Sequence, residues 1–228
     1  MTAVLKIHLN DKLYLKDPDD TELGRKIVQK SIEIIEKLGF EQFTFKKLAL
    51  AINSTEASIY RYFENKHKLL IYIISWYWAW LLYRIEYETH NIQDEHEQLK
   101  RILRVISESS RPEMTLVYID PSLLHRIVVA EAAKVYLTKN VDEDNKIGLF
   151  KEYKALCYKI ASTILKIKPT YKYAHSLAST IIESAHQQLF FARHFKTITE
   201  LNNGNNLYRN VAEFIEHLTF SALNDQKH

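Results

Sequence analysis

The sequence contains 228 residues, of which 4 are glycine and 4 are proline. Average usage would give about 27 of these two residue types together. The shortage therefore excludes collagen-like chains, low-complexity linkers and most turn-rich all-β folds. Hydrophobic residues make up 46% and charged residues 26% of the chain, which indicates a globular protein with a buried core. The length suggests one large or two small domains.

Charge and cysteine content narrow the class of protein. The net charge is +3, and residues 21–70 carry nine Lys/Arg against six Asp/Glu, so the basic excess lies in one short segment. This balance supports nucleic-acid binding only weakly. The single cysteine, Cys157, excludes an intramolecular disulfide and a cysteine-based zinc cluster, and no signal peptide opens the sequence. We expect a cytoplasmic protein.

The first residues differ from the rest of the chain. Apolar residues flank the turn dipeptide Asn10-Asp11 on both sides, and this pattern is typical of a small hairpin. An extended arm that lies over a helical body fits residues 1–19 equally well, and both interpretations stay open.

Three short helices are predicted over residues 20–66. Apolar residues recur at helical spacing between Asp19 and Lys37, and Gly39 suits a helix end. Thr44 is placed as the N-cap of a second helix that runs to about residue 52. A third helix starts at Ser54 or Thr55 and ends near residue 63.

The remaining residues, 67–228, also show helical patterns. A long helix after residue 66 carries an aromatic stripe, and its longest uncharged stretch, residues 69–83, is shorter than the roughly 20 residues that a membrane span needs. Further helices are predicted at about 94–109, 121–139, 145–167, 170–196 and 206–223, with the acidic run at 142–145 as a break. The fold class is therefore all-α, with a three-helix N-terminal domain and a C-terminal helical bundle. We expect no membrane association.

Residues 44–63 carry the most specific functional signal. A short helix, a tight turn and a second short helix are typical of a helix-turn-helix, whose second helix enters the major groove of DNA. Asn53 occupies the turn, where a residue tolerant of positive φ is favoured. The structural alternative is a helical hairpin without DNA contact. The predicted DNA-binding residues are Thr44, Lys46, Lys47, Thr55, Glu56, Ala57, Ser58, Tyr60, Arg61, Tyr62 and Lys66.

The run from Arg25 to Leu70 resembles the N-terminal domain of TetR/AcrR-type transcriptional regulators. The family signature corresponds here to Gly39-Phe40, Thr44, Tyr60-Arg61-Tyr62-Phe63 and Lys66. The sequence departs from the family at Asn53, where glycine is common, and at Glu56, where a basic or polar residue is frequent.

The resemblance implies a ligand-responsive regulator, with repression as the expected output, that binds a palindromic double-stranded DNA operator as a homodimer. It also implies that the last two helices, about 170–223, form the dimer interface, and that the middle helices enclose a pocket for a small-molecule inducer. The chain would then divide into a DNA-binding domain at 20–66 and a ligand-sensing and dimerisation domain at 67–228.

Other candidate sites are weaker. The aromatic side chains Trp76, Trp80, Tyr83 and Tyr87 are candidates to line a ligand pocket, although helical spacing also fits plain core. Glu183 and His186 lie one helical turn apart, but a di-iron site needs a second such motif. No catalytic triad or glycine-rich phosphate loop is visible, so we expect neither an enzyme nor a cofactor nor a metal site. The alternatives to operator binding are a helical metal-binding module and a protein-interaction module.

Overall fold

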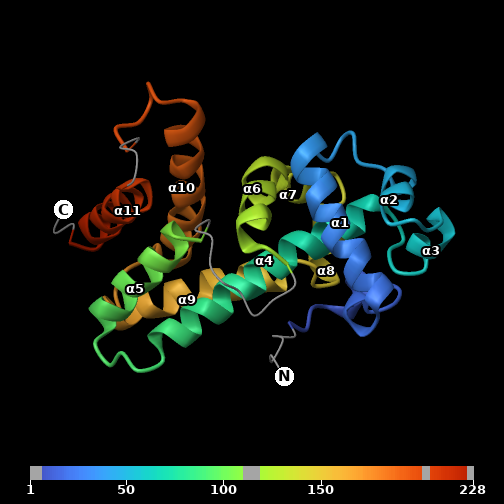
Figure 1. Ribbon diagram of the computed structural model, residues 1–228. Helices are drawn as coiled ribbons and strands as arrows, with labels where there is room; N and C mark the ends of the chain where they lie inside the picture. The colour runs from blue at the N-terminus through green and yellow to red at the C-terminus, as the bar shows by residue number, and fades with distance from the viewer. Residues whose placement is uncertain (1–6, 110–118, 202–205, 225–228) are drawn as a thin grey trace. The chain divides into compact units, whose positions relative to one another are not determined.

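A computed structural model describes residues 7–109, 119–201 and 206–224 (Figure 1). Over these residues the chain forms helices and no strands, which confirms the all-α prediction. Two single-turn 3-10 helices, at Asp11–Leu13 and Pro18–Asp20, precede the α-helices. The α-helices are α1 (Glu22–Leu38), α2 (Phe45–Ala51), α3 (Glu56–Tyr60), α4 (Lys66–Thr89), α5 (Glu95–Ser107), α6 (Pro121–Glu131), α7 (Ala133–Tyr136), α8 (Val141–Lys146), α9 (Lys151–Ile167), α10 (Ala174–His194) and α11 (Leu207–Asn224).

The helices pack into two compact units. The first unit comprises Met1–Trp80 with Pro112–Tyr153, and the second comprises Leu81–Arg111 with Lys154–His228. The division falls inside α4 and inside α9. Packing therefore divides the chain differently from the predicted functional domains at 20–66 and 67–228, which remain a prediction.

The N-terminal segment of the first unit is an arm rather than a hairpin. Of the two alternatives that the sequence left open, the hairpin does not fit residues 7–15, because Asn10 is the N-cap of a 3-10 helix and no strand flanks it there. The Asn10 side-chain amide donates to the carbonyls of Ile147 and Gly148, and the Leu15 amide donates to the carbonyl of Tyr62. These contacts reach residues far along the chain, so the segment is held by the turns that follow α3 and α8. Residues 1–6 lie outside the described part.

The first turn of helix α1 lies in close contact with the backbone of Pro18. Thr21 is its N-cap, with the hydroxyl accepting from the Gly24 amide. A Cβ at Gly24 would lie 2.3 Å from the carbonyl oxygen of Pro18. Glycine is therefore required where the Pro18–Asp20 turn crosses the first turn of α1.

The region between 121 and 167 is more broken than the periodicity predicted. The single helix expected at 121–139 is two helices, α6 and α7. The acidic run, predicted as a break, instead forms α8, where carboxylates in the first turn interact favourably with the positive end of the helix. Gly148, with φ of +80°, then separates α8 from α9, so the helix expected to start at 145 begins at Lys151.

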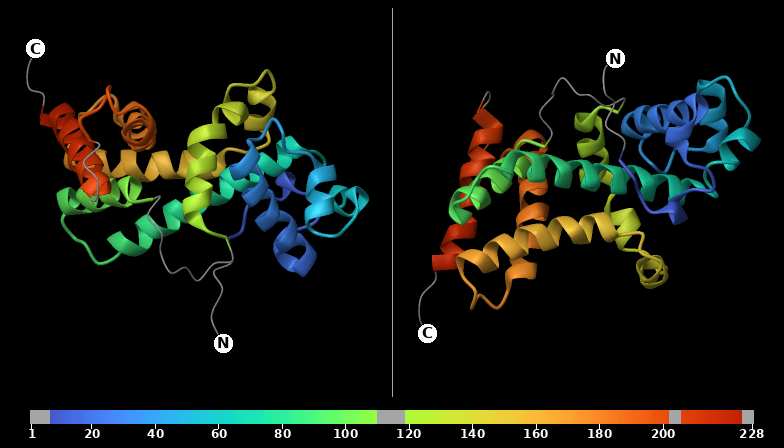
Figure 2. Two further views of the ribbon diagram at one scale, coloured as in Figure 1. Left: turned by 45° about the horizontal axis from the view of Figure 1, so that its top comes forward. Right: turned by 90° about the horizontal axis from the view of Figure 1, so that it is seen from below.

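In the second unit, α5, α10 and α11 pack against one another (Figures 1 and 2). The apolar faces of α10 and α11 supply much of this core, including Ile181, Ile182 and Ile215, which are fully buried. The Lys168 ammonium donates to the carbonyl of Leu223 at 2.6 Å, in the last turn of α11. In the described part of the chain, no helix has both the length and the apolar character needed to span a membrane.

His186 of α10 gives a testable pH dependence. Burial lowers its pKa from 6.5 to about 3, so the folded protein holds the neutral imidazole at pH values where the unfolded chain takes up a proton. The contribution of neutral His186 to the stability of the fold is therefore complete above about pH 6.5, and it is lost as the pH falls toward 3. In that window we expect His186 to lower the free energy of unfolding by about 1.4 kcal/mol per pH unit. Urea unfolding between pH 7 and pH 4.5 measures this slope.

The matched comparison is His186→Leu against His175→Leu, because His175 is exposed on the same helix. We expect the first substitution to flatten the pH dependence and the second to leave it as in the wild type. Equal slopes in all three proteins would contradict a buried, neutral His186.

Candidate nucleic-acid interface

Helices α2 and α3 are two short, capped helices joined by a tight turn. The Thr44 hydroxyl accepts from the Lys47 amide at 3.2 Å, and the Thr55 hydroxyl accepts from the Ser58 amide at 3.2 Å. Asn53, in the turn, has φ of +53° and is the only non-glycine residue with positive φ in the described ranges. The positive φ predicted for Asn53 is thereby confirmed.

Apolar contacts fix the two helices to the rest of the first unit. Leu48 and Ala49 of α2 and Ile59 of α3 are buried. The ring of Phe45 meets the ring of Tyr60 edge-on at 5.0 Å between centroids. Because the inner faces are packed, the outer faces of α2 and α3 have fixed positions.

The outer face of α3 is polar and exposed. Glu56, Ala57 and Arg61 are exposed, and half of the Tyr60 side chain is exposed. The Arg61 guanidinium donates to the Ser58 hydroxyl at 3.2 Å, and that hydroxyl lies 3.0 Å from the hydroxyl of Thr55. The three side chains form one network along the helix, which presents donors and acceptors on a single surface.

On α2, Lys46 and Lys47 are also exposed. The Lys47 ammonium donates to the carbonyl of Gln42 at 2.8 Å, so it sits beside the N-terminus of α2. These ammonium groups and the hydroxyl of exposed Thr44 are the types of donor that bind phosphate oxygens.

Tyr62, predicted as a DNA contact, lies in the interior. Its side chain is 4% exposed, and its hydroxyl is hydrogen-bonded to the Thr21 hydroxyl at 2.7 Å. The structure therefore places Tyr62 where it ties the end of α3 to the start of α1, away from the exposed face.

Lys66, also predicted as a DNA contact, is engaged within the fold. Its ammonium lies 3.2, 3.4 and 3.3 Å from the carbonyls of Phe40, Glu41 and Phe43, and 4.6 Å from the centroid of the Phe40 ring. The ammonium of Lys66 thus donates to three carbonyls of the turn between α1 and α2. We call these residues, 39–43, the α1–α2 turn.

The same turn is held from α6 by a residue that the sequence analysis did not identify. A carboxylate oxygen of buried Glu131 accepts from the Phe40 amide at 3.0 Å, across 91 residues of sequence. Its other oxygen lies 2.7 Å from the Lys134 ammonium, which also lies 3.1 Å from Glu41. The hydrogen bond to Glu131 raises the pKa of Lys134. Neither periodicity nor a motif links Glu131 to this turn, so no sequence signal could have found it.

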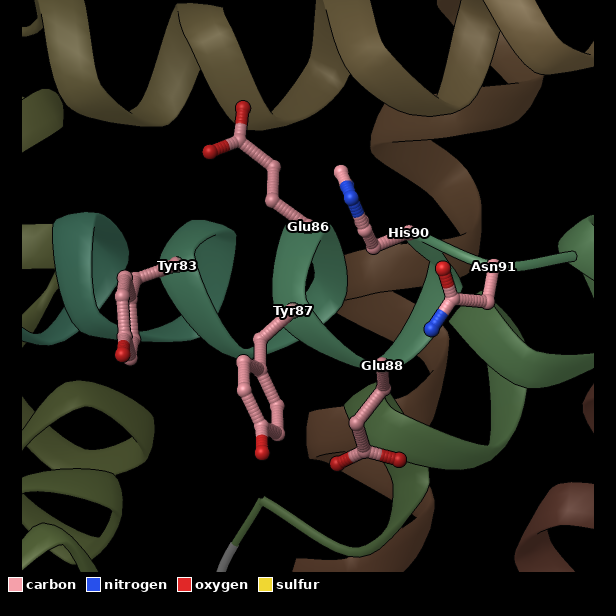
Figure 3. Close-up of a pocket in the computed structure, with 6 residues that line it drawn as sticks. All are labelled: Tyr83, Glu86, Tyr87, Glu88, His90 and Asn91. Atoms are coloured by element: carbon pink, nitrogen blue, oxygen red, sulfur yellow. The ribbon is translucent and has the colours of Figure 1, made fainter.

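The four predicted pocket residues differ in exposure. Trp76 and Trp80 are buried in the first unit. Tyr83 and Tyr87 are exposed and line a surface hollow of about 560 Å³ with Glu86, Glu88, His90 and Asn91 (Figure 3). The two tyrosine rings are stacked, with 6.4 Å between centroids. The hollow is formed by the last turns of α4 and the turn that follows it.

The weaker metal hypothesis finds no support. His186 is buried, whereas Glu183, one turn before it, is exposed. Within the described residues, no three His, Cys, Asp or Glu side chains are grouped so that they could hold a metal ion.

Comparison with known proteins gives one sequence match and many structural ones. Residues 27–73 match the family model described as bacterial regulatory proteins, tetR family. No curated protein matches the sequence.

Three solved structures are similar in fold. A TetR-family transcriptional regulator from Pectobacterium atrosepticum has a TM-score of 0.60 and 16% identity, over 93% of this chain and 100% of that one. AibR, solved with isovaleryl coenzyme A and operator DNA, has a TM-score of 0.60 and 15% identity, over 85% and 97%. The superantigen PfiT has a TM-score of 0.62 and 14% identity, over 92% and 100%. At these identities the likeness shows the fold alone.

The role of Lys66 in the α1–α2 turn predicts a loss of stability on substitution. Lys66→Met removes the cation but keeps the aliphatic stem, and leaves the three carbonyls without it. We expect the free energy of unfolding, measured with urea, to fall by about 1–3 kcal/mol.

Lys46→Met is the control, because Lys46 is exposed and makes no side-chain polar contact within the described residues. We expect it to change stability by less than about 0.5 kcal/mol. A Lys66→Met protein as stable as the control would show that the carbonyl contacts contribute nothing.

Proposed function

The chain belongs to the TetR family of bacterial regulatory proteins, and from that premise we propose that it is a ligand-responsive transcriptional regulator that binds a palindromic operator as a homodimer. The observation that carries the proposal is the exposed face of α3, where Thr55, Ser58 and Arg61 form one polar network beside a packed inner face. Such a face can lie in the major groove, which is about 12 Å wide and admits one helix.

Within this surface we assign two kinds of contact. Arg61, Ser58 and Glu56 are the proposed base contacts, because guanidinium, hydroxyl and carboxylate groups can each read a base edge. Ala57 has a small side chain and allows close approach of the backbone. Tyr60, half exposed at the end of the helix, borders this surface.

Phosphates are the proposed partners of the flanking groups. Lys46 and Lys47 supply cations, and Thr44 supplies a hydroxyl, at the start of α2. Tyr62 and Lys66 act in this proposal as positioning residues, because one is buried and the other holds the α1–α2 turn.

A homodimer through residues about 170–223 accounts for a second feature of the chain. Phe195 and Ile198, after α10, are more than half exposed, and Phe195 contacts the rings of Phe190 and Phe191. Exposed apolar clusters of this kind are typical of protein–protein interfaces. In the dimer, two copies of α3 would occupy successive major grooves about 34–36 Å apart.

Ligand binding would act on that spacing. The ligand would bind more tightly to a form of the dimer in which the distance between the two α3 helices does not fit the operator. Operator binding is then weakened by as much as the ligand prefers that form. The output is then repression in the absence of ligand.

The operator can be found without knowledge of the regulated genes. The purified protein is mixed with random duplex DNA, and bound molecules are selected and sequenced. We expect a palindrome whose half-sites are centred about 10 base pairs, or a multiple of this, apart. Binding of all sequences alike, or of none, would contradict the proposal and favour a protein-interaction module.

Two alanine substitutions distinguish phosphate contacts from base contacts. We expect Lys46→Ala to weaken binding of the selected operator and of random duplex alike. Because the homodimer carries two copies of Lys46, the steepness of log affinity against log salt should fall by about 1.8, which is about 0.9 for each protomer. Arg61→Ala should reduce affinity for the operator by about tenfold or more while leaving random duplex nearly unchanged. Fluorescence anisotropy at several salt concentrations measures both quantities.

Lys166→Ala is the charge-matched control, since Lys166 is exposed on α9 in the second unit, outside the proposed DNA-binding surface and outside the proposed dimer interface. It should leave the salt slope unchanged. The assignment of Lys46 fails if Lys46→Ala and Lys166→Ala have the same slope.

A further inference from the structure

The exposed face of α3 carries one acidic side chain among groups that otherwise suit DNA. Glu56 is the first residue of the helix, and its side chain is exposed. The other charged side chains exposed on α2 and at the end of α3 are the cations Lys46, Lys47 and Arg61. Lys47 and Arg61 each donate a hydrogen bond within the fold, whereas the Glu56 carboxylate has no polar partner among the described residues. Glu56 therefore presents a negative charge to whatever meets this face.

A negative charge at this position opposes binding to the DNA backbone. Attraction to phosphates supplies nearly all of the affinity of a protein for non-specific duplex DNA, and a carboxylate repels phosphates. In the groove the carboxylate also loses water, and this loss is costly unless a hydrogen-bond donor replaces the water. Glu56 therefore weakens binding to every sequence that offers it no donor.

The bases differ in the donors that they offer to a carboxylate in the major groove. Two bases present an amino group there, cytosine through N4 and adenine through N6. In an A·T pair the amino group lies between two acceptors, N7 of adenine and O4 of thymine, which both repel a carboxylate. In a C·G pair the cytosine amino group has an acceptor on one side only, which is O6 of guanine. A carboxylate in the major groove therefore prefers cytosine.

The place of Glu56 in the helix favours a contact with a base edge. The first residues of a recognition helix are the ones that contact bases, and Glu56 is the first residue of α3. We propose that Glu56 selects a C·G pair in each operator half-site, because it accepts a hydrogen bond from the cytosine amino group and disfavours the other base pairs. The proposal rests on the proposed function, since it names the base pair that the same surface reads. Specificity then comes from repulsion as well as from attraction.

A role for Glu56 in the helix alone predicts a different result. A carboxylate in the first turn of a helix interacts favourably with the positive helix end. If this were the only role of Glu56, removal of its charge would change the stability of the protein and leave its preference among bases as it was. Base preference is therefore the quantity to measure.

The test selects operators from random duplex DNA with the full-length wild type, with Glu56→Gln and with Glu143→Gln. Glu143 is the matched control, because it is exposed in the first turn of the short helix α8, outside the proposed DNA-binding surface. We expect the wild type and Glu143→Gln to select the same C·G pair in each half-site. Glu56→Gln should lose this preference or shift it to adenine, with which glutamine pairs, and should bind random duplex more tightly than the wild type.

A deletion of the amino group assigns the contact to one atom. In a synthetic operator the selected cytosine is replaced by 2-pyrimidinone, which lacks only the amino group. We expect the wild type and Glu143→Gln to bind this duplex about tenfold more weakly for each half-site that is changed. Glu56→Ala should bind the changed and unchanged duplexes nearly alike. Fluorescence anisotropy measures the four affinities of such a cycle, which cancels any effect of the analogue on the duplex itself.

The same C·G preference in the wild type and in Glu56→Gln would overturn the proposal, and so would an equal loss for the wild type and Glu56→Ala on deletion of the amino group. Either result would leave the regulatory function intact, because an operator had been selected. If no palindromic operator is selected, the proposed function fails and this proposal fails with it. Urea unfolding checks each variant, and if one does not fold the other decides, since both lack the carboxylate.

Discussion

The arrangement of the DNA-binding region depends on how five residues between α1 and α2 are held. The α1–α2 turn leaves backbone groups without helical partners, and two side chains of opposite charge satisfy them. Lys66, at the start of α4, donates hydrogen bonds to three carbonyls of the turn. Glu131, at the end of α6, accepts a hydrogen bond from the Phe40 amide. Because α4 and α6 both meet the turn in this way, the start of α2 is fixed relative to each of them. The position of α3 follows through its packing on α2.

The surface proposed to meet DNA is a consequence of that support. Thr44 and Thr55 cap the two short helices, Asn53 allows the tight turn between them, and the buried side of each helix is apolar. A five-residue helix has little stability of its own. Its polar face can serve recognition because tertiary contacts, rather than α3 itself, keep Ser58 and Arg61 in place.

Features with local causes could be predicted from the sequence, whereas features with distant causes could not. The caps Thr44 and Thr55 and the positive φ of Asn53 depend on neighbouring residues, and the TetR resemblance on a short ordered motif. The contact of Glu131 with Phe40 and the interior role of Lys66 join segments that no pattern relates. The choice between a hairpin and an arm around Asn10 stayed open for the same reason, because the side-chain amide of Asn10 donates to the distant carbonyls of Ile147 and Gly148. The aromatic stripe of α4 shows the limit of periodicity: Trp76 is buried and Tyr87 exposed on one helical face.

Hydrogen exchange measured by mass spectrometry, with and without the selected operator duplex, tests most directly that α3 and the start of α2 form the DNA-binding surface. Exchange should slow in peptides covering residues 44–62 when the operator is added, and an unrelated duplex at moderate salt should produce a much smaller effect. Slowed exchange confined to other segments, or the same slowing with both duplexes, would contradict this assignment.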